Sequence, residues 1–228
     1  MDLEKQKRIT IITGHFGSGK TEFSINYGIE LSKKEDRKVC LIDLDIINTY
    51  FRLREQDKYL KEHGIGILST AFNVSSLDIP ALDPAIEGAI IDKGKRVLID
   101  VGGNPSGARA LGRYKPVLES QGYDQIFVVN ANRPETNNAD QVIDFINLTQ
   151  AQSQTRINGL VNTTHLLKDT SVEDIMRGQA LLKEVSERTG IPIVLTVALR
   201  CLVDDLKKLD PGMNIFPIDL HFRSDWML

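Results

Sequence analysis

Residues 14–21 read GHFGSGKT and fit the pattern G-x-x-x-x-G-K-[ST], which constrains the fold of this chain more than any other segment. Its glycines let the backbone turn tightly, so that successive N–H groups point inward at an anion. In such a loop Lys20 reaches the β- and γ-phosphates of a nucleotide, and the Thr21 hydroxyl binds Mg²⁺. The pattern therefore predicts a loop that holds a nucleoside triphosphate. Its predicted nucleotide contacts are Gly14, His15, Phe16, Gly17, Ser18, Gly19, Lys20 and Thr21.

The segments on either side distinguish this loop from a chance glycine-rich turn. Residues 8–13 form a β-branched run typical of a central parallel strand. After the loop, Phe23, Tyr27 and Leu31 recur at helical spacing, which predicts a helix with one packed face. A helix that begins here directs its unpaired N–H groups and its positive dipole end at the phosphates.

The rest of the chain alternates short apolar runs with longer helical patterns. Further strands are predicted at residues 39–43, 65–68, 96–100, 125–129, 157–161 and 193–197. We expect an α/β fold of three layers, the P-loop NTPase fold, with a mostly parallel sheet of about seven strands and helices on both faces.

Helix signals agree with this alternation. A helix is predicted to start at Pro134, and a second to start at a capping box of Thr170 and Glu173 and to end at Gly190 before Pro192. No linker or repeat divides the chain, so residues 1–228 are predicted to form one nucleotide-binding domain. Residues 210–228 depart from the alternation and are predicted to be an irregular C-terminal segment that packs back on the domain or joins an oligomer contact.

Composition narrows the possible partners, metal sites and cellular compartment of the protein. The 28 basic and 31 acidic residues give a formal net charge of −3 and no general footprint for nucleic acid. Two distant cysteines and four isolated histidines show no metal-ligand spacing. No apolar stretch is long enough to span a bilayer, and the first residues lack the apolar core of a signal peptide. We expect a cytoplasmic protein.

Acidic residues follow two of the predicted strands, at the edge of the sheet where ligands bind in such folds. Asp43 and Asp45 end one strand, where one carboxylate holds the hydration shell of Mg²⁺ and the other orients an attacking water. Alternatively, Asp45 merely caps a turn. Asp100 ends another strand and is a predicted Mg²⁺ ligand together with Thr21. The N–H of Gly103 is placed to sense the γ-phosphate, and residues 104–114 are predicted to be a mobile switch loop.

Residues 14–21, 41–45 and 98–103, in this order and separation, resemble the MinD/ParA-like branch of P-loop ATPases, the CobQ/CobB/MinD/ParA nucleotide-binding domain. The resemblance implies a nucleotide-binding fold with ATP and Mg²⁺. Many members carry a signature lysine early in the loop that reaches the partner's nucleotide across a dimer. Here that position is His15, so a homodimer is open but lacks this device.

The choice of base rests on two segments. GTPases commonly read guanine with N-K-x-D, and neither residues 130–133 nor residues 162–165 supply the lysine and the aspartate. Asn162 is similar in position to an asparagine that contacts adenine in relatives, although a strand-end asparagine bonded to local backbone explains it equally. These features favour ATP over GTP.

Three functions fit these residues. The first is a Mg²⁺-dependent ATPase in which Lys20 neutralises charge and Asp45, with Asp43 near, orients the water, so that hydrolysis changes a loop or the contact with an unidentified partner. The second is an ATP-dependent small-molecule kinase or ligase with an acceptor site along residues 69–83. The third is a nucleotide-gated binding module without turnover. Four arginines on the two expected switch segments are candidate arginine fingers or ordinary surface ion pairs: Arg52, Arg54, Arg109 and Arg113.

Overall fold

A computed structural model of the chain describes residues 6–44, 57–69 and 84–221. An eight-stranded sheet runs through it in the order β3-β2-β4-β1-β5-β6-β7-β8, and every neighbouring pair of strands is parallel. The strands are β1 (Ile9–Gly14), β2 (Lys38–Leu44), β3 (Ile65–Ser69), β4 (Lys95–Val101), β5 (Asp124–Val129), β6 (Gly159–Asn162), β7 (Ile193–Leu199) and β8 (Ile215–Ile218). The predicted parallel α/β architecture is confirmed, with one strand more than expected.

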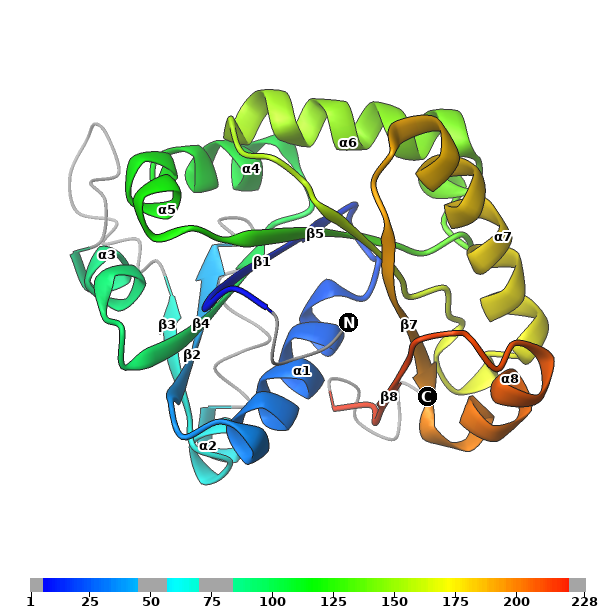
Figure 1. The fold of residues 1–228 in the computed structure, drawn as a ribbon, viewed down its shortest axis with the longest axis horizontal. Helices are drawn as coiled ribbons and strands as arrows, with labels where there is room; N and C mark the ends of the chain where they lie inside the picture. The colour runs from blue at the N-terminus through cyan, green and yellow to red at the C-terminus, as the bar shows by residue number, and fades with distance from the viewer. Residues whose placement is uncertain (1–5, 45–56, 70–83, 222–228) are drawn as a thin grey trace.

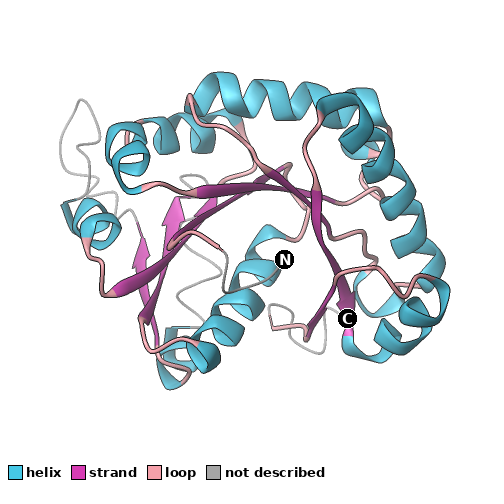
Figure 2. Cartoon of the chain, in the orientation of Figure 1, coloured by secondary structure: helices cyan, strands magenta, loops and turns pink. Residues whose placement is uncertain are grey.

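Helices cover both faces of the sheet (Figures 1 and 2). They are α1 (Lys20–Lys34), α2 (Asp57–Glu62), α3 (Pro84–Ile91), α4 (Pro105–Gly112), α5 (Lys115–Gln121), α6 (Ala139–Ser153), α7 (Val172–Thr189) and α8 (Val203–Leu209). The apolar side chains of α1 and α2 pack on one face, and those of α3 to α7 pack on the other.

The alternation of side chains along each strand explains why both faces need a cover. Successive residues of a strand point to opposite faces. In β4, Leu98 therefore joins the core under α1, whereas Val97 and Ile99 join the core under α3, α4 and α5. All three side chains are fully buried. The strands accordingly read as continuous apolar runs, as is typical of parallel sheets.

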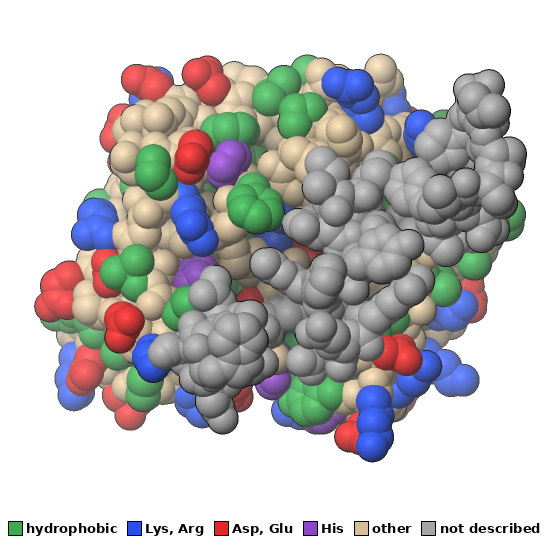
Figure 3. Space-filling view, turned by 180° about the vertical axis from the view of Figure 1, so that it is seen from behind, with side chains coloured by type: hydrophobic (Ala, Val, Ile, Leu, Met, Phe, Trp, Pro, Cys, Tyr) green, Lys and Arg blue, Asp and Glu red, His purple; other side chains and the backbone are tan. Residues whose placement is uncertain are grey.

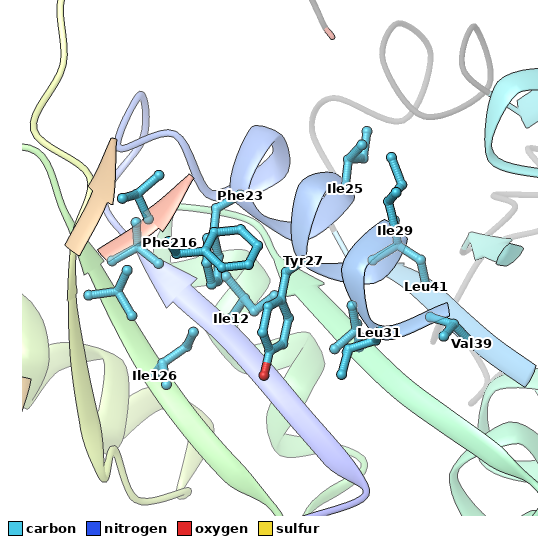
Figure 4. Close-up of a cluster of buried hydrophobic side chains, with 14 of the residues drawn as sticks. Ile12, Phe23, Ile25, Tyr27, Ile29, Leu31, Val39, Leu41, Ile126 and Phe216 are labelled. Carbon is cyan, nitrogen blue, oxygen red and sulfur yellow. The ribbon is translucent and has the colours of Figure 1, made fainter. Parts of the chain in front are cut away.

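Helix α1 packs across the middle of the sheet through the predicted residues. Figure 4 shows Phe23 and Tyr27 pointing from α1 toward Ile12 of β1 and Phe216 of β8. The Phe23 and Tyr27 rings stack with centroids 5.3 Å apart, and each meets the edge of Phe216 at 5.7 Å. This aromatic cluster fixes α1, and with it the loop before α1, on the carboxyl end of β1.

Phe216 also shows why the prediction for the C-terminal segment was wrong in part. Residues 215–218 form β8, which pairs with β7 from Thr196↔Ile215 to Leu199↔Ile218. The strand is short and contains Pro217, so its sequence gives a weak signal. Proline lacks an N–H, and it is tolerated here because β8 is the edge strand of the sheet.

Two helix starts also differ from expectation. The capping box of α7 consists of Ser171 and Asp174, one residue after the predicted pair. The Ser171 backbone N–H holds the pKa of the Asp174 carboxyl below its usual value. Helix α6 begins at Ala139 with Asn138 as its cap, because Pro134 starts a separate 3₁₀ turn. Both predictions misplaced a start, while the end of α7 at Gly190 is confirmed.

The surface carries charges of both signs. On the face in Figure 3, the described Lys and Arg side chains are interspersed with Asp and Glu rather than gathered by sign. None of the described helices is both long enough and apolar enough to span a membrane.

Substitution of Phe216 tests whether β8 is an integral part of the core. We expect Phe216→Ala to lower the free energy of unfolding by about 3–5 kcal/mol, because the change empties a ring-sized volume against α1. Urea denaturation measures this loss. Leu209→Ala is the control, since Leu209 is 62% exposed at the end of α8 and should change stability by less than about 0.5 kcal/mol. Equal effects of both changes would show that β8 is dispensable.

Candidate nucleotide-binding site

The predicted phosphate-binding loop connects β1 to α1. Its residues Gly17 and Gly19 have φ angles of +73° and +82°, in the left-handed region that favours glycine. The Ser18 N–H donates to the His15 carbonyl at 3.2 Å, which closes the turn. The Lys20 ammonium group donates to the same carbonyl at 2.9 Å. The Lys20 side chain therefore folds back over its own loop, toward the His15 carbonyl.

Backbone from other strands approaches this loop at distances that no side chain could occupy. A Cβ on Gly14 would lie 2.3 Å from the Val128 carbonyl oxygen of β5. A Cβ on Gly103, which follows β4, would lie 2.5 Å from the Phe16 nitrogen and 2.8 Å from the Lys20 Nζ. Gly103 thus lies against the loop and beside its lysine.

A hydroxyl group after β6 holds the loop from a third side. Thr163 is buried, and its Oγ1 lies 2.5 Å from the Ser18 carbonyl and 3.0 Å from the Val129 carbonyl. The carbonyl of Ser18 therefore has a donor outside the loop, and the turn is fixed to the ends of β5 and β6.

A cavity opens between this loop and the carboxyl ends of the strands. The predicted residues Phe16, Gly17, Gly19, Lys20, Thr21 and Asp100 all line it. The wall beyond them is formed mainly by residues that follow β6, by the last residues of β7, and by the C-terminal segment from the end of β8 onward. These residues are Thr163, Thr164, His165, Leu167, Thr170, Val197, Ala198, Leu199, Ile218 and Leu220.

The predicted carboxylates of β2 and β4 lie side by side. Asp43 and Asp100 are register partners in the parallel pair β2–β4, so both side chains emerge on the α1 face of the sheet. Asp100 is buried at 4% exposure and lines the cavity with Lys20 and Thr21. Asp43 is one strand further out and is not part of the lining that the described residues form. Asp45 lies outside the described residues.

Asn162 does not offer its amide to the cavity. The residue is fully buried, its Nδ2 donates to the Ile175 carbonyl at 2.9 Å, and its Oδ1 accepts the Thr164 N–H at 3.0 Å. Both ends of the amide are thus bonded to backbone. The predicted contact between Asn162 and adenine is therefore corrected. Asn162 fits the alternative, a strand-end asparagine bonded to backbone, and it joins β6 to α7.

His15 turns away from the cavity. Its ring packs on Phe145 of α6 with centroids 4.5 Å apart, and it lines a separate small hollow behind the loop together with Gly14 and Gly103. Among the predicted loop contacts, His15 and Gly14 therefore face α6 rather than the main cavity. Ser18 is also outside the lining, since its side chain is fully buried.

The expected switch loop at residues 104–114 is mostly helical. Asn104 caps α4 by accepting the Gly107 N–H at 2.9 Å, and Pro105 occupies the first turn. Asn104 and Pro105 are typical of loops, but in this order they form a helix start. Arg109 points to Gln152 of α6 at 2.8 Å, and neither it nor Arg113 lines the cavity. Arg52 and Arg54 lie outside the described residues.

Sequence reasoning missed two side chains of the site. Arg133, after β5, donates from Nε to the Gly17 carbonyl at 3.0 Å and lines the cavity. His165, after β6, lies so close to Gly19 that a Cβ there would be 3.1 Å from its Nε2. The Nδ1 of His165 accepts the Leu167 N–H at 3.2 Å, so in the neutral ring the proton is on Nε2, the nitrogen next to the loop. The signal available was their position at strand ends, the same signal that selected Asp100.

The C-terminal segment completes the wall and packs back on the domain. After β8, the Asp219 N–H and carbonyl bond reciprocally to the side chain of Asn26 in α1, at 3.0 and 2.9 Å. The His221 N–H donates to Glu22 at 2.5 Å. Burial lowers the pKa of His221, against the opposing effect of Asp219. Residues 218–221 therefore lie along the first turns of α1, next to Lys20 and Thr21.

Among the residues that the structure describes, the site contains no preformed cluster for a metal. No group of three His, Cys, Asp or Glu side chains gathers in the described parts of the chain. The candidate ligands are one hydroxyl, Thr21, and one carboxylate, Asp100. This donor set fits Mg²⁺, which is commonly held by one or two protein oxygens together with phosphate oxygens and water.

Solved structures share this fold. The signal recognition particle receptor FtsY from Elizabethkingia anophelis, in complex with GDP, superposes with a TM-score of 0.52 at 18% identity over 83% of this chain and 56% of that chain. FtsY from Thermotoga maritima gives 0.55 at 14% identity over 83% and 61%. A nucleotide-binding protein from Archaeoglobus fulgidus in complex with ADP gives 0.46 at 15% identity over 89% and 87%.

The similarities to FtsY establish the fold, which is that of the P-loop NTPases. The chain spans about three fifths of the length of the FtsY chains that it matches. No protein-family model matches the sequence, and no curated protein matches it. The likenesses do not single out the MinD/ParA branch.

Substitution of Gly103 tests the close approach of β4 to the loop. We expect Gly103→Ala to lower the free energy of unfolding by about 1–3 kcal/mol, because the new methyl group overlaps backbone atoms that cannot turn aside. Gly88→Ala in α3 is the matched control. A Cβ on Gly88 meets nothing within 4 Å, so this change should raise stability by about 0.4–1 kcal/mol. Urea denaturation of both variants decides, and a neutral Gly103→Ala would contradict the packing.

Proposed function

We propose that this protein binds a nucleoside triphosphate with Mg²⁺, prefers ATP, and hydrolyses it to switch a loop or a partner contact. One observation carries the proposal: Lys20, Thr21 and Asp100 line one cavity beside a loop whose Gly17 and Gly19 adopt left-handed conformations. A cation, a hydroxyl group and a carboxylate thus surround backbone N–H groups at the start of α1. This combination fits a phosphate chain with its metal ion.

The roles on the phosphate side follow from the chemistry of these groups. Lys20 exchanges its bond with the His15 carbonyl for phosphate oxygens, a stronger charge-assisted bond. Thr21 and Asp100 would hold Mg²⁺, which neutralises negative charge on the phosphates. Gly103 has its backbone against Phe16 and Lys20, so the position of its N–H depends on what occupies the space beside Lys20. Asp45, with Asp43 near, is proposed to orient the attacking water.

The wall beyond the phosphates favours adenine over guanine. Guanine presents an imino N–H and an amino N–H, and a carboxylate normally accepts the hydrogen bonds from both. The acidic residues that line the cavity, within the described part of the chain, are Asp100 and Glu22. Asp100 is on the phosphate side, and Glu22 already accepts the His221 N–H. The remaining wall offers the apolar side chains of Leu167 and Leu199 and the neutral hydroxyl groups of Thr164 and Thr170 but no further carboxylate among the described residues, which suits adenine better than guanine.

Competition between nucleotides tests this preference. We expect ATP to displace a fluorescent ATP analogue at least about tenfold more effectively than GTP does, because guanine would leave buried donors without acceptors. CTP serves as a control for binding through the phosphates alone. Equal potency of GTP and ATP would contradict the adenine preference and leave triphosphate binding intact.

Two substitutions separate binding from turnover. We expect Lys20→Ala to weaken ATP binding by about 100-fold, because it removes charge-assisted bonds to the phosphates. Asp45→Asn should bind ATP like the unmodified protein but release phosphate at least about 100-fold more slowly, because the water loses its orienting carboxylate. Calorimetry and phosphate release measure the two effects, with exposed Lys207→Ala as control. An Asp45→Asn variant with unchanged turnover would show that the water-orienting role is wrong.

A further inference from the structure

We infer that Arg133 donates hydrogen bonds to the phosphates of the nucleotide. Arg133 lies outside the loop of residues 14–21 in sequence and adds its positive charge to the phosphate site that this loop forms. This inference rests on the nucleotide binding proposed above and adds a residue to that site. The feature that carries it is a guanidinium group held against the loop and inside the lining of the cavity.

The position of the guanidinium group is set by the loop. Its Nε donates to the Gly17 carbonyl at 3.0 Å, and a Cβ on Gly17 would lie 2.8 Å from Cζ and 2.9 Å from Nη2. The guanidinium group therefore occupies the space that a side chain at position 17 would fill. Arg133 lines the same cavity as Lys20 and Thr21. Gly17 serves both the turn of the loop and the approach of the arginine.

The backbone that carries Arg133 is fixed by buried hydrogen bonds. The Arg133 N–H donates to the Asn130 carbonyl at 3.1 Å. The buried Asn130 side chain accepts the N–H groups of Asn132 and His165 at 3.0 and 3.3 Å. The Ala131 N–H donates to Thr164 at 3.0 Å. The segment after β5 is thus fastened to the segment after β6, so little conformational freedom remains to be lost when a ligand binds.

The charge of Arg133 has no acidic partner among the described residues. By contrast Arg177, Arg188 and Arg200 each form an ion pair with a carboxylate. A guanidinium group has five N–H donors, and the Gly17 carbonyl takes one of them. The planar group matches the oxygens of a phosphate, to which it can donate twice. A nucleotide phosphate chain beside Gly17 is the anion that fits this position.

The experiment uses inorganic tripolyphosphate, which carries the phosphates without base or ribose. In Arg133→Gln the amide can still donate to the Gly17 carbonyl, but the positive charge is gone. We expect this variant to bind tripolyphosphate and MgADP about 10- to 100-fold more weakly in calorimetry, as for a lost charge-assisted contact. Its binding should also depend less on salt concentration. Arg188→Gln, the same change at an exposed ion pair remote from the cavity lining, should bind like the unmodified protein.

Arg133→Lys keeps the charge and loses the planar group, and it tests the inference if the glutamine variant folds poorly. It should bind tripolyphosphate more tightly than Arg133→Gln. If Arg133→Gln binds as the unmodified protein does while Lys20→Ala fails, Arg133 only braces the loop and the inference is overturned. The same holds if the lysine and glutamine variants lose equal affinity. If Lys20→Ala also binds normally, the proposed function itself is wrong.

Discussion

Backbone packed against backbone around residues 14–19 is the constraint on which the rest of this structure depends. Gly14 meets the Val128 carbonyl, and Gly103 meets the Phe16 nitrogen, at distances that exclude any Cβ. A methyl group at either place would push apart strands that must be adjacent. The sheet order places β1 between β4 and β5, and those two neighbours supply the contacts. The loop is therefore shaped by the sheet as much as by its own sequence.

This constraint explains how much of the site could be predicted. The spacing of Gly14, Lys20 and Thr21 reports a backbone conformation, and local conformation is what sequence spacing encodes well. The apolar runs likewise predicted seven of the eight strands, because both faces of a central parallel strand are buried. The position of Asp100 at this edge of the sheet was predictable because Asp100 ends such a run. In each case a short stretch of sequence contains the whole signal.

The features that were missed depend on contacts between distant segments. Asn162 ends a strand at the expected edge, but the approach of α7 decides which way its amide turns: a Cβ on Gly178 would lie 2.5 Å from its Oδ1. Arg133 is remote from Gly17 in sequence and reaches it only because β5 lies beside β1. Strand β8 is short and contains a proline, so its pairing with β7 and its packing under Phe23 leave little trace in local sequence. No pattern within one segment could have revealed these contacts.

The same contacts divide the site into two parts. One part, here called the fastened part, is joined to the loop and α1 by hydrogen bonds, and the other only touches the loop through van der Waals contacts. Arg133 and Thr163 hydrogen-bond to the loop, and residues 218–221 hydrogen-bond to α1, so the loop, the β5 and β6 ends and the C-terminal wall are joined by directional bonds. Gly103 touches Phe16 and Lys20, but no hydrogen bond joins it to the loop among the described residues. A contact without directional bonds costs less to rearrange. The segment after β4 is therefore the part of the site that is least costly to displace. Under the proposed function, a terminal phosphate would move this segment while the fastened part holds the nucleotide.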